Sequence, residues 1–372
     1  MLSSLFALVG CGRPEPVPPL AGVSAAPVVA AAPAAPLRVF FSGHSLMDRP
    51  LPDQVEALAR ADGVALGWDR QYRIGSLMRE RTRGTDPAAA SWTGWAQGEN
   101  REGQGLDVLA ALSGQNRELE PFDVLVTTER HDILWAMTNE SSAAYLRALH
   151  DARVRGRPEG STWFYEGWQS FGPGQVGAWA TYERSAAGAW QCVAAEVNRS
   201  LAEAGRADRV WSLPASRALV ALVEAALSSP GLPGISAGDE GATLARLFKD
   251  EVHLTELGMH YMALVTWAFV SGRPAAMPWR PDGVTEEQSQ SLRKVAVQAH
   301  ESLRSQTLVQ ASAADCEVQL QALCPVYWAY MEQRQLATGR STLAARWDRT
   351  RDAWRCERAV AQGRHRIEPT RP

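Results

Sequence analysis

The chain alternates between short apolar runs that favour strands and amphipathic segments that favour helices. The expected strands are 37–42, 64–74, 122–127, 161–165 and 209–213. The expected helices are 53–61, 141–153, 217–227 and 256–270. Strands that alternate with helices form βαβ units, whose parallel sheet is covered by helices on both faces. The pattern predicts a three-layer α/β/α sandwich over residues 37–280.

No run that favours a strand follows residue 280. A capping box at 285–288 starts one helix, and further helices are expected at 313–336 and 342–361. Pro325 is expected to kink or divide the first of these two. Residues 281–372 are therefore predicted to form a helical appendage at the C-terminus.

Cysteine usage points to an oxidising compartment. The five cysteines are Cys11, Cys192, Cys316, Cys324 and Cys356, and no two of them form a C-x-x-C motif. Cys324 lies 15 residues before Gly339, where the two last helices reverse direction, and Cys356 lies 17 residues after it. The two cysteines nearly face each other across this hairpin. Cys324–Cys356 is thus our first choice among the three pairings open to the last four cysteines.

The N-terminus has the pattern of an export signal. Residues 2–10 are apolar but too few to span a bilayer, and they end directly before Cys11. Leu-Val-Gly-Cys at 8–11 resembles the cleavage box of bacterial lipoproteins, although no Lys or Arg precedes it. We expect residues 1–11 to be a signal peptide with lipidation at Cys11, and 12–36, rich in Pro and Ala, to be a disordered tether. The predicted location is the bacterial cell envelope, on the periplasmic side and anchored to the membrane.

The charge of the chain argues against one class of partner. It has 38 basic and 41 acidic residues, a formal net charge of −3. Dedicated nucleic-acid binders carry a basic excess, so no nucleic-acid partner is expected.

Three residues have the chemistry of a hydrolase. Ser45 directly follows the first expected strand, and Asp250 and His253 precede the helix expected at 256–270. A serine hydroxyl becomes a good nucleophile when a histidine takes its proton, and the histidine needs an acceptor that fixes its tautomer. The carboxyl ends of parallel strands form the ligand-binding edge of such a sheet. The fold can therefore bring the distant Ser45 and His253 together there.

These residues carry a resemblance to a known family. Gly-His-Ser-Leu at 43–46 and Asp-Glu-Val-His-Leu-Thr-Glu-Leu-Gly at 250–258 resemble the first and last blocks of the SGNH/GDSL hydrolases. The resemblance covers about residues 37–274, and it implies a flavodoxin-like α/β/α sandwich that cleaves esters without a cofactor. It implies that Ser45 is the nucleophile, His253 the base and Asp250 its partner, and that the backbone N–H of Ser45 belongs to the oxyanion hole.

The chain departs from the family pattern at three places. His44 replaces the aspartate beside the nucleophile, and Gly75 is the best match to the glycine of the second block, an oxyanion donor. The third block, Gly-x-Asn-Asp, is absent, and residues 127–132 stand in its place. Arg130 and His131 are the candidates to replace its asparagine, and the sequence does not choose between them.

Other polar residues are expected at the functional edge. The candidates for substrate contact follow the third and fourth strands, and they are Glu129, Arg130, His131, Glu166 and Trp168. Packing is the alternative role for Glu166 and Trp168. His131 and Asp132 are adjacent, but two ligands are too few for a metal site, so no metal is expected.

The sequence leaves three hypotheses about function. The first is a serine esterase that removes an acyl or acetyl group from a small molecule or a carbohydrate through an acyl-enzyme. The second is a binding or scaffold lipoprotein that kept this fold and lost turnover, as the missing third block suggests. The third gives the main role to the helical appendage, as a docking module for another envelope protein.

Overall fold

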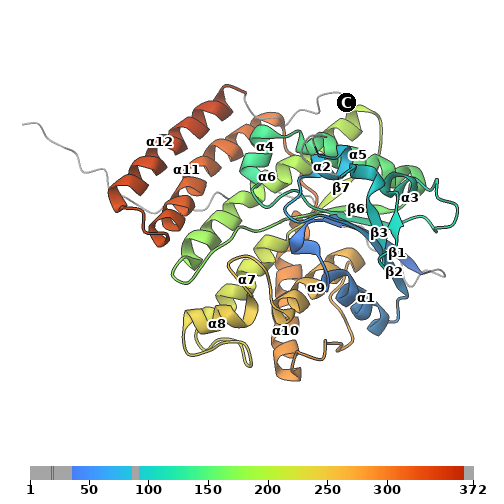
Figure 1. Cartoon of the computed structure of the whole chain (residues 1–372), viewed down its shortest axis with the longest axis horizontal. Helices are drawn as coiled ribbons and strands as arrows, with labels where there is room; N and C mark the ends of the chain where they lie inside the picture. Colours follow the sequence, from blue (N-terminus) through green and yellow to red (C-terminus); the bar gives the residue numbers. More distant parts are fainter. Residues whose placement is uncertain (1–17, 19, 21–35, 86–91, 364–372) are drawn as a thin grey trace, which may run out of the picture.

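The computed structural model describes residues 18, 20, 36–85 and 92–363. A seven-stranded sheet with the order β4-β3-β2-β1-β5-β6-β7 forms its centre (Figure 1). The strands are β1 (Leu37–Gly43), β2 (Leu66–Tyr72), β3 (Gly98–Asn100), β4 (Gly105–Leu106), β5 (Val124–Thr127), β6 (Ser161–Tyr165) and β7 (Val210–Leu213). Neighbouring strands in the order β2-β1-β5-β6-β7 pair in parallel. The short β3 pairs antiparallel with β2 and with β4.

Helices cover both faces of this sheet (Figure 1). One layer contains α1 (Leu51–Ala61), α7 (Ala215–Leu227), α8 (Glu240–Leu247), α9 (Glu256–Ser271) and α10 (Glu286–Leu303). The other contains α2 (Met78–Arg83), α3 (Val108–Leu112), α4 (Ile133–Asn139), α5 (Ser142–Gly156) and α6 (Val176–Glu203). The three-layer α/β/α architecture is confirmed. The chain moves from β1 to β2 on one side and then to β5 on the other, so the direction of winding changes at β1.

The boundary between body and appendage lies later than the sequence predicts. Helix α10 packs on α9 and α7, and its Leu292 side chain is fully buried in the same core. The apolar stripe of α10 completes one helical layer of the sandwich. The appendage therefore consists of α11 (Ala313–Ala337) and α12 (Thr342–Ala361).

Two disulfides fix the appendage. Helix α11 packs on α6, continues through Pro325 without division, and pairs with α12. Cys324–Cys356 joins α11 to α12, which confirms that predicted pairing, and Cys192–Cys316 joins α6 to α11. Within the described ranges, no helix is both long and apolar enough to cross a membrane.

Removing the Cys192–Cys316 disulfide is expected to cost more stability than removing Cys324–Cys356. The first closes a loop of 124 residues and the second a loop of 32. A longer loop loses more chain entropy on closure, which makes the difference about 1 kcal/mol. Urea unfolding of the two double Cys→Ser variants tests this order. A larger loss from the Cys324–Cys356 pair would contradict it.

Two residues of the expected tether contact the body. The Leu20 N–H donates to Gln191 Oε1 of α6 at 3.1 Å, and the Pro18 carbonyl accepts from Gln319 Nε2 of α11 at 3.2 Å. The prediction of a disordered tether is wrong for Pro18 and Leu20. The rest of 12–35, together with Cys11 and the signal segment, lies outside the described residues.

Buried histidines make the stability depend on pH. Burial, assisted by the charge of Arg293, lowers the pKa of His260 on α9 to about 4. In the unfolded chain that pKa is about 6.5, so the unfolded state binds more protons between these values. The free energy of unfolding therefore falls as the pH drops from 6.5 towards 4. We expect His260→Gln to reduce this fall by about 1–2 kcal/mol in urea titrations near pH 7 and pH 5. The same fall in both proteins would contradict the assignment.

Candidate active site

Ser45 lies at the carboxyl edge of the sheet, directly beyond β1. A 3-10 turn, Ser45–Met47, follows the strand and leaves the Ser45 side chain half-buried. Gly43 makes this tight turn possible, because a Cβ at Gly43 would lie 2.9 Å from the Met47 side chain. The turn points the hydroxyl out of the strand, at the place where the direction of winding changes.

The structure brings Ser45, His253 and Asp250 together, as the sequence predicts. His253 Nε2 lies 3.0 Å from Ser45 Oγ, and His253 Nδ1 lies 2.7 Å from Asp250 Oδ2. Asp250 accepts the Nδ1–H, which leaves Nε2 free to accept the proton of the serine hydroxyl. This is the hydrogen-bond pattern of a serine nucleophile with its base and orienting carboxylate.

Asp250 is held as a carboxylate. Partial burial acts to raise its pKa, but hydrogen bonds from the backbone N–H groups of His253 and Val252 and from the His253 ring outweigh burial and lower the pKa to about 2. The two backbone bonds are 2.7 and 2.8 Å long. Asp250 is thus ionised throughout the neutral range and can stabilise an imidazolium on His253.

The loop that carries Asp250 and His253 is held from several sides. Phe248 and Leu254 form a β-bridge at its base, and the indole N–H of Trp168 donates to the Val252 carbonyl at 2.9 Å. Trp168 is fully buried. Its predicted contact with substrate is therefore wrong; it positions the residue next to His253 instead.

The predicted substrate contacts of Glu129 and Glu166 are wrong for the same reason. Both side chains are fully buried. Glu166 pairs with Arg217 at 2.8 Å, and Glu129 accepts from the Met78 N–H at 3.0 Å and from the Ser142 hydroxyl at 2.8 Å. A buried carboxylate needs such partners, and these partners come from distant parts of the chain. Both residues support loops at the edge of the sheet.

Two backbone N–H groups, one at Ser45 and one in the turn after β2, have no acceptor among the described residues. Arg73 N donates to the Gly43 carbonyl at 3.3 Å, which holds the turn after β2 beside the end of β1. Gly75 lies exposed in that turn with φ +61°. Among the described residues, neither the Ser45 N–H nor the Gly75 N–H has a hydrogen-bond acceptor. Both predicted oxyanion donors thus remain free to donate.

His44 contacts the loop that follows β5. It is fully buried, and its Nε2 lies 3.1 Å from the Glu129 carbonyl. Burial, with the nearby charges of Arg81 and His131, lowers the pKa of His44 to about 3. His44 is therefore neutral near pH 7 and donates to Glu129. This bond ties the end of β5 to the turn that carries Ser45.

The His131 ring lies beside the His44 ring. Its ring centroid is 6.0 Å from that of His44, and burial, together with the charges of Arg130 and His253, lowers the pKa of His131 to about 4. Its ring has no hydrogen-bond partner among the described residues. Arg130 instead stacks on Trp135, 4.3 Å from the ring centroid. His131 is thus a neutral imidazole with an unused N–H close to His253.

The appendage contacts loops next to the site. The sequence does not predict these contacts. Three side chains of α11 contact loops at the carboxyl edge of the sheet. Tyr327 donates to Asp132 at 3.2 Å, Tyr330 donates to the Ser170 carbonyl at 2.6 Å, and Arg334 pairs with Glu251. Asp132 and Glu251 are neighbours of His131 and Asp250. The appendage therefore packs on loops next to the triad.

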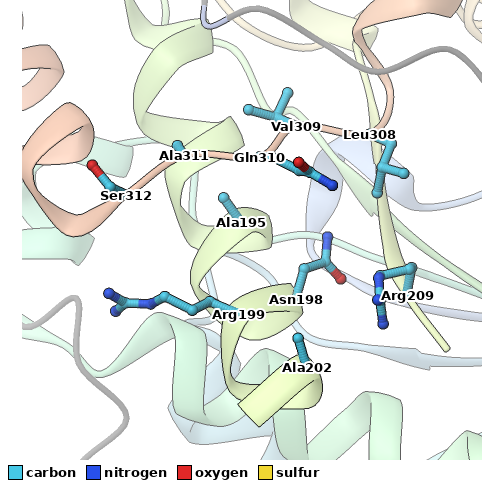
Figure 2. A pocket seen from close by; sticks show the side chains of 10 residues that line it. All are labelled: Ala195, Asn198, Arg199, Ala202, Arg209, Leu308, Val309, Gln310, Ala311 and Ser312. Carbon is cyan, nitrogen blue, oxygen red and sulfur yellow. The ribbon is translucent and has the colours of Figure 1, made fainter. Parts of the chain in front are cut away.

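A cavity of about 320 Å³ lies elsewhere (Figure 2). Side chains of α6, including Asn198 and Arg199, line it together with Arg209 and the segment before α11. Arg209 precedes β7, so this cavity is at the amino end of the strands, opposite to Ser45. In the part of the chain that the structure describes, no three His, Cys, Asp or Glu side chains gather to hold a metal ion.

Comparisons with known proteins find one distant structural likeness. No protein-family model and no curated protein matches the chain. The chain is similar to the crystal structure of a DUF4886 family protein from Bacteroides uniformis, with 14% identity and a TM-score of 0.47. The match covers 71% of this chain and 95% of that one.

Proposed function

We propose that the protein is a serine ester hydrolase of the SGNH/GDSL type. One observation carries the proposal: His253 Nε2 lies 3.0 Å from Ser45 Oγ although the residues are 208 positions apart. Random surface contacts do not place a serine, a histidine and a carboxylate in series at the ligand-binding edge of a parallel sheet.

The proposed reaction has two halves. Ser45 Oγ attacks the ester carbonyl while His253 Nε2 takes the hydroxyl proton, and Asp250 stabilises the resulting imidazolium. The tetrahedral intermediate collapses, the C–O bond to the alcohol breaks, and His253 returns the proton to the leaving oxygen. Water, deprotonated by His253, then attacks the acyl-serine. The carboxylic acid leaves, and Ser45 regains its proton.

Three donors are proposed for the oxyanion. The N–H groups of Ser45 and Gly75 supply two, and the neutral ring of His131 supplies the third in place of the family's asparagine. A neutral imidazole donates one N–H, as an amide side chain does. Arg130 is the poorer candidate because its guanidinium is engaged with Trp135.

The exposure of the site bears on the substrate. The side chains of His253 and Asp250 are 41% and 55% exposed. A triad this open can accept an ester on a large alcohol whose bulk stays in solvent. This supports acyl or acetyl groups on a carbohydrate as the proposed substrate class.

We also propose export and lipidation at Cys11. All four cysteines within the described residues form disulfides. Disulfides persist in the oxidising envelope and are rare in the cytosol. Incorporation of radiolabelled palmitate in a bacterial host, lost in Cys11→Ser, tests the anchor.

Rapid-mixing kinetics with p-nitrophenyl acetate separate an esterase from a binding protein of the same fold. An acyl-enzyme mechanism predicts a burst of nitrophenol followed by slower steady release, or steady release alone if deacylation is fast. A binding protein gives neither above the rate of the uncatalysed reaction. That result would favour the scaffold hypothesis.

A further inference from the structure

The outer side of α12 exposes large apolar side chains. Leu343, Trp347 and Trp354 are 83%, 68% and 57% exposed. They are four and seven residues apart, which places them on one side of the helix. The opposite side, with Ala345 buried, packs on α11. In Figure 1, α12 is the outermost helix of the appendage. We call Leu343, Trp347 and Trp354 the outer face of α12.

The neighbouring part of α11 extends this apolar surface. Val318 is 64% exposed and lines, together with Ala322, Pro325 and Trp354, a groove of about 530 Å³ between the two helices. Tryptophan combines a large apolar body with a polar N–H, and such side chains concentrate where lipid meets water. An exposed pair on one helix face is costly in water and favourable at that boundary.

Arginines flank the outer face. Arg358 stacks on the Trp354 ring at 5.2 Å, and Arg355 is 64% exposed and pairs with Asp352 at 3.4 Å. Helix α12 holds five arginines against three acids, and from residue 340 onwards the chain has nine against four. Apolar side chains bordered by arginines are typical of helices that lie in the surface of anionic membranes.

The path of the chain leads to the same surface. Gln319, next to Val318 on α11, binds the Pro18 carbonyl at 3.2 Å. Cys11 precedes Pro18 by seven residues, and seven extended residues reach at most about 25 Å. A lipid anchor at Cys11 would therefore hold a bilayer close to the start of α11 and to the groove beside Trp354.

We propose that the outer face of α12 binds the surface of a bilayer containing anionic phospholipid. Trp347 and Trp354 enter the boundary between headgroups and acyl chains, and Arg355 and Arg358 meet the phosphates. Two disulfides and the contacts of α11 with the site loops then hold the triad at a fixed position relative to the membrane. The role of this face does not depend on catalysis by Ser45.

Sedimentation with vesicles tests the proposal. The experiment uses the full chain with Cys11→Ser, because this substitution removes any acyl anchor. We expect it to bind vesicles of equal phosphatidylglycerol and phosphatidylcholine, and to bind pure phosphatidylcholine at least about tenfold more weakly. Adding Trp347→Ala and Trp354→Ala is expected to weaken binding to the anionic vesicles at least about tenfold. Met277→Ala, which removes a 53% exposed side chain from the body, is the matched control and should bind as the parent does.

Three results would overturn the proposal. They are unchanged binding of the double tryptophan variant, equal binding to both kinds of vesicle, and a dimer without lipid that depends on Trp347 and Trp354. Quenching of fluorescence by brominated lipid, present in the parent and lost in the double variant, supports insertion independently of sedimentation. Both side chains are mostly exposed, so thermal midpoints should show that the variants fold.

Discussion

Ser45→Ala is expected to lower kcat for p-nitrophenyl acetate by at least about 10³-fold. The reason is chemical, because alanine lacks the hydroxyl that acts as the nucleophile in the proposed mechanism. The side chain is half-buried, and His253 is its one hydrogen-bond partner among the residues that the structure describes, so its loss leaves the core unchanged. Urea midpoints of variant and wild type should therefore agree.

Ser42→Ala is the matched control for this variant. Ser42 lies three residues earlier in β1, is fully buried, and bonds to Gln71 and Arg81. Its loss is expected to lower stability and to leave kcat within about threefold of wild type. Turnover that survives Ser45→Ala would assign the activity to another group and end the present mechanism.

His131→Leu is expected to lower kcat by about 10²–10³-fold with little change in KM, because an oxyanion donor acts on the transition state and not on the bound ester. His131→Asn restores an N–H donor at the position where the resembled family has asparagine. We expect it to recover kcat to within about tenfold of wild type.

Arg130→Gln distinguishes the two residues that the sequence could not separate. It removes the cation over Trp135 and should change kcat less than His131→Leu does. Because burial, with Arg130 and the His253 ring nearby, lowers the pKa of His131 to about 4, the effect of His131→Leu should be constant from about pH 6 to pH 9. A large loss in Arg130→Gln, with full activity in His131→Leu, would reverse the assignment.

Local patterns explain why the framework and the triad could be predicted from the sequence. The runs that became β1 and β6 are compact and apolar, and a parallel sheet directs their carboxyl ends to one edge. Asp250 and His253 lie on one turn, so their contact is local and their spacing is informative. The contact between His253 and Ser45 follows from the fold class together with the resemblance of both segments to the SGNH/GDSL blocks.

Features set by distant residues were missed. Helix α6 is buried on most sides by its neighbours, so it lacks the polar stripe that marks a surface helix. Glu166 was expected to meet substrate, but it is neutralised by Arg217, 51 residues away. The contacts of Tyr327 and Arg334 with the site loops likewise depend on how α11 docks. The local sequence pattern does not indicate any of these contacts.

Labelling with a fluorophosphonate, followed by peptide mapping, tests whether His253 activates Ser45. The reagent reacts with a serine whose proton is taken by a neighbouring base. We expect one adduct per chain, on the peptide that contains Ser45, and its loss in His253→Ala. An unlabelled protein, or an adduct on another serine that persists in His253→Ala, would contradict it.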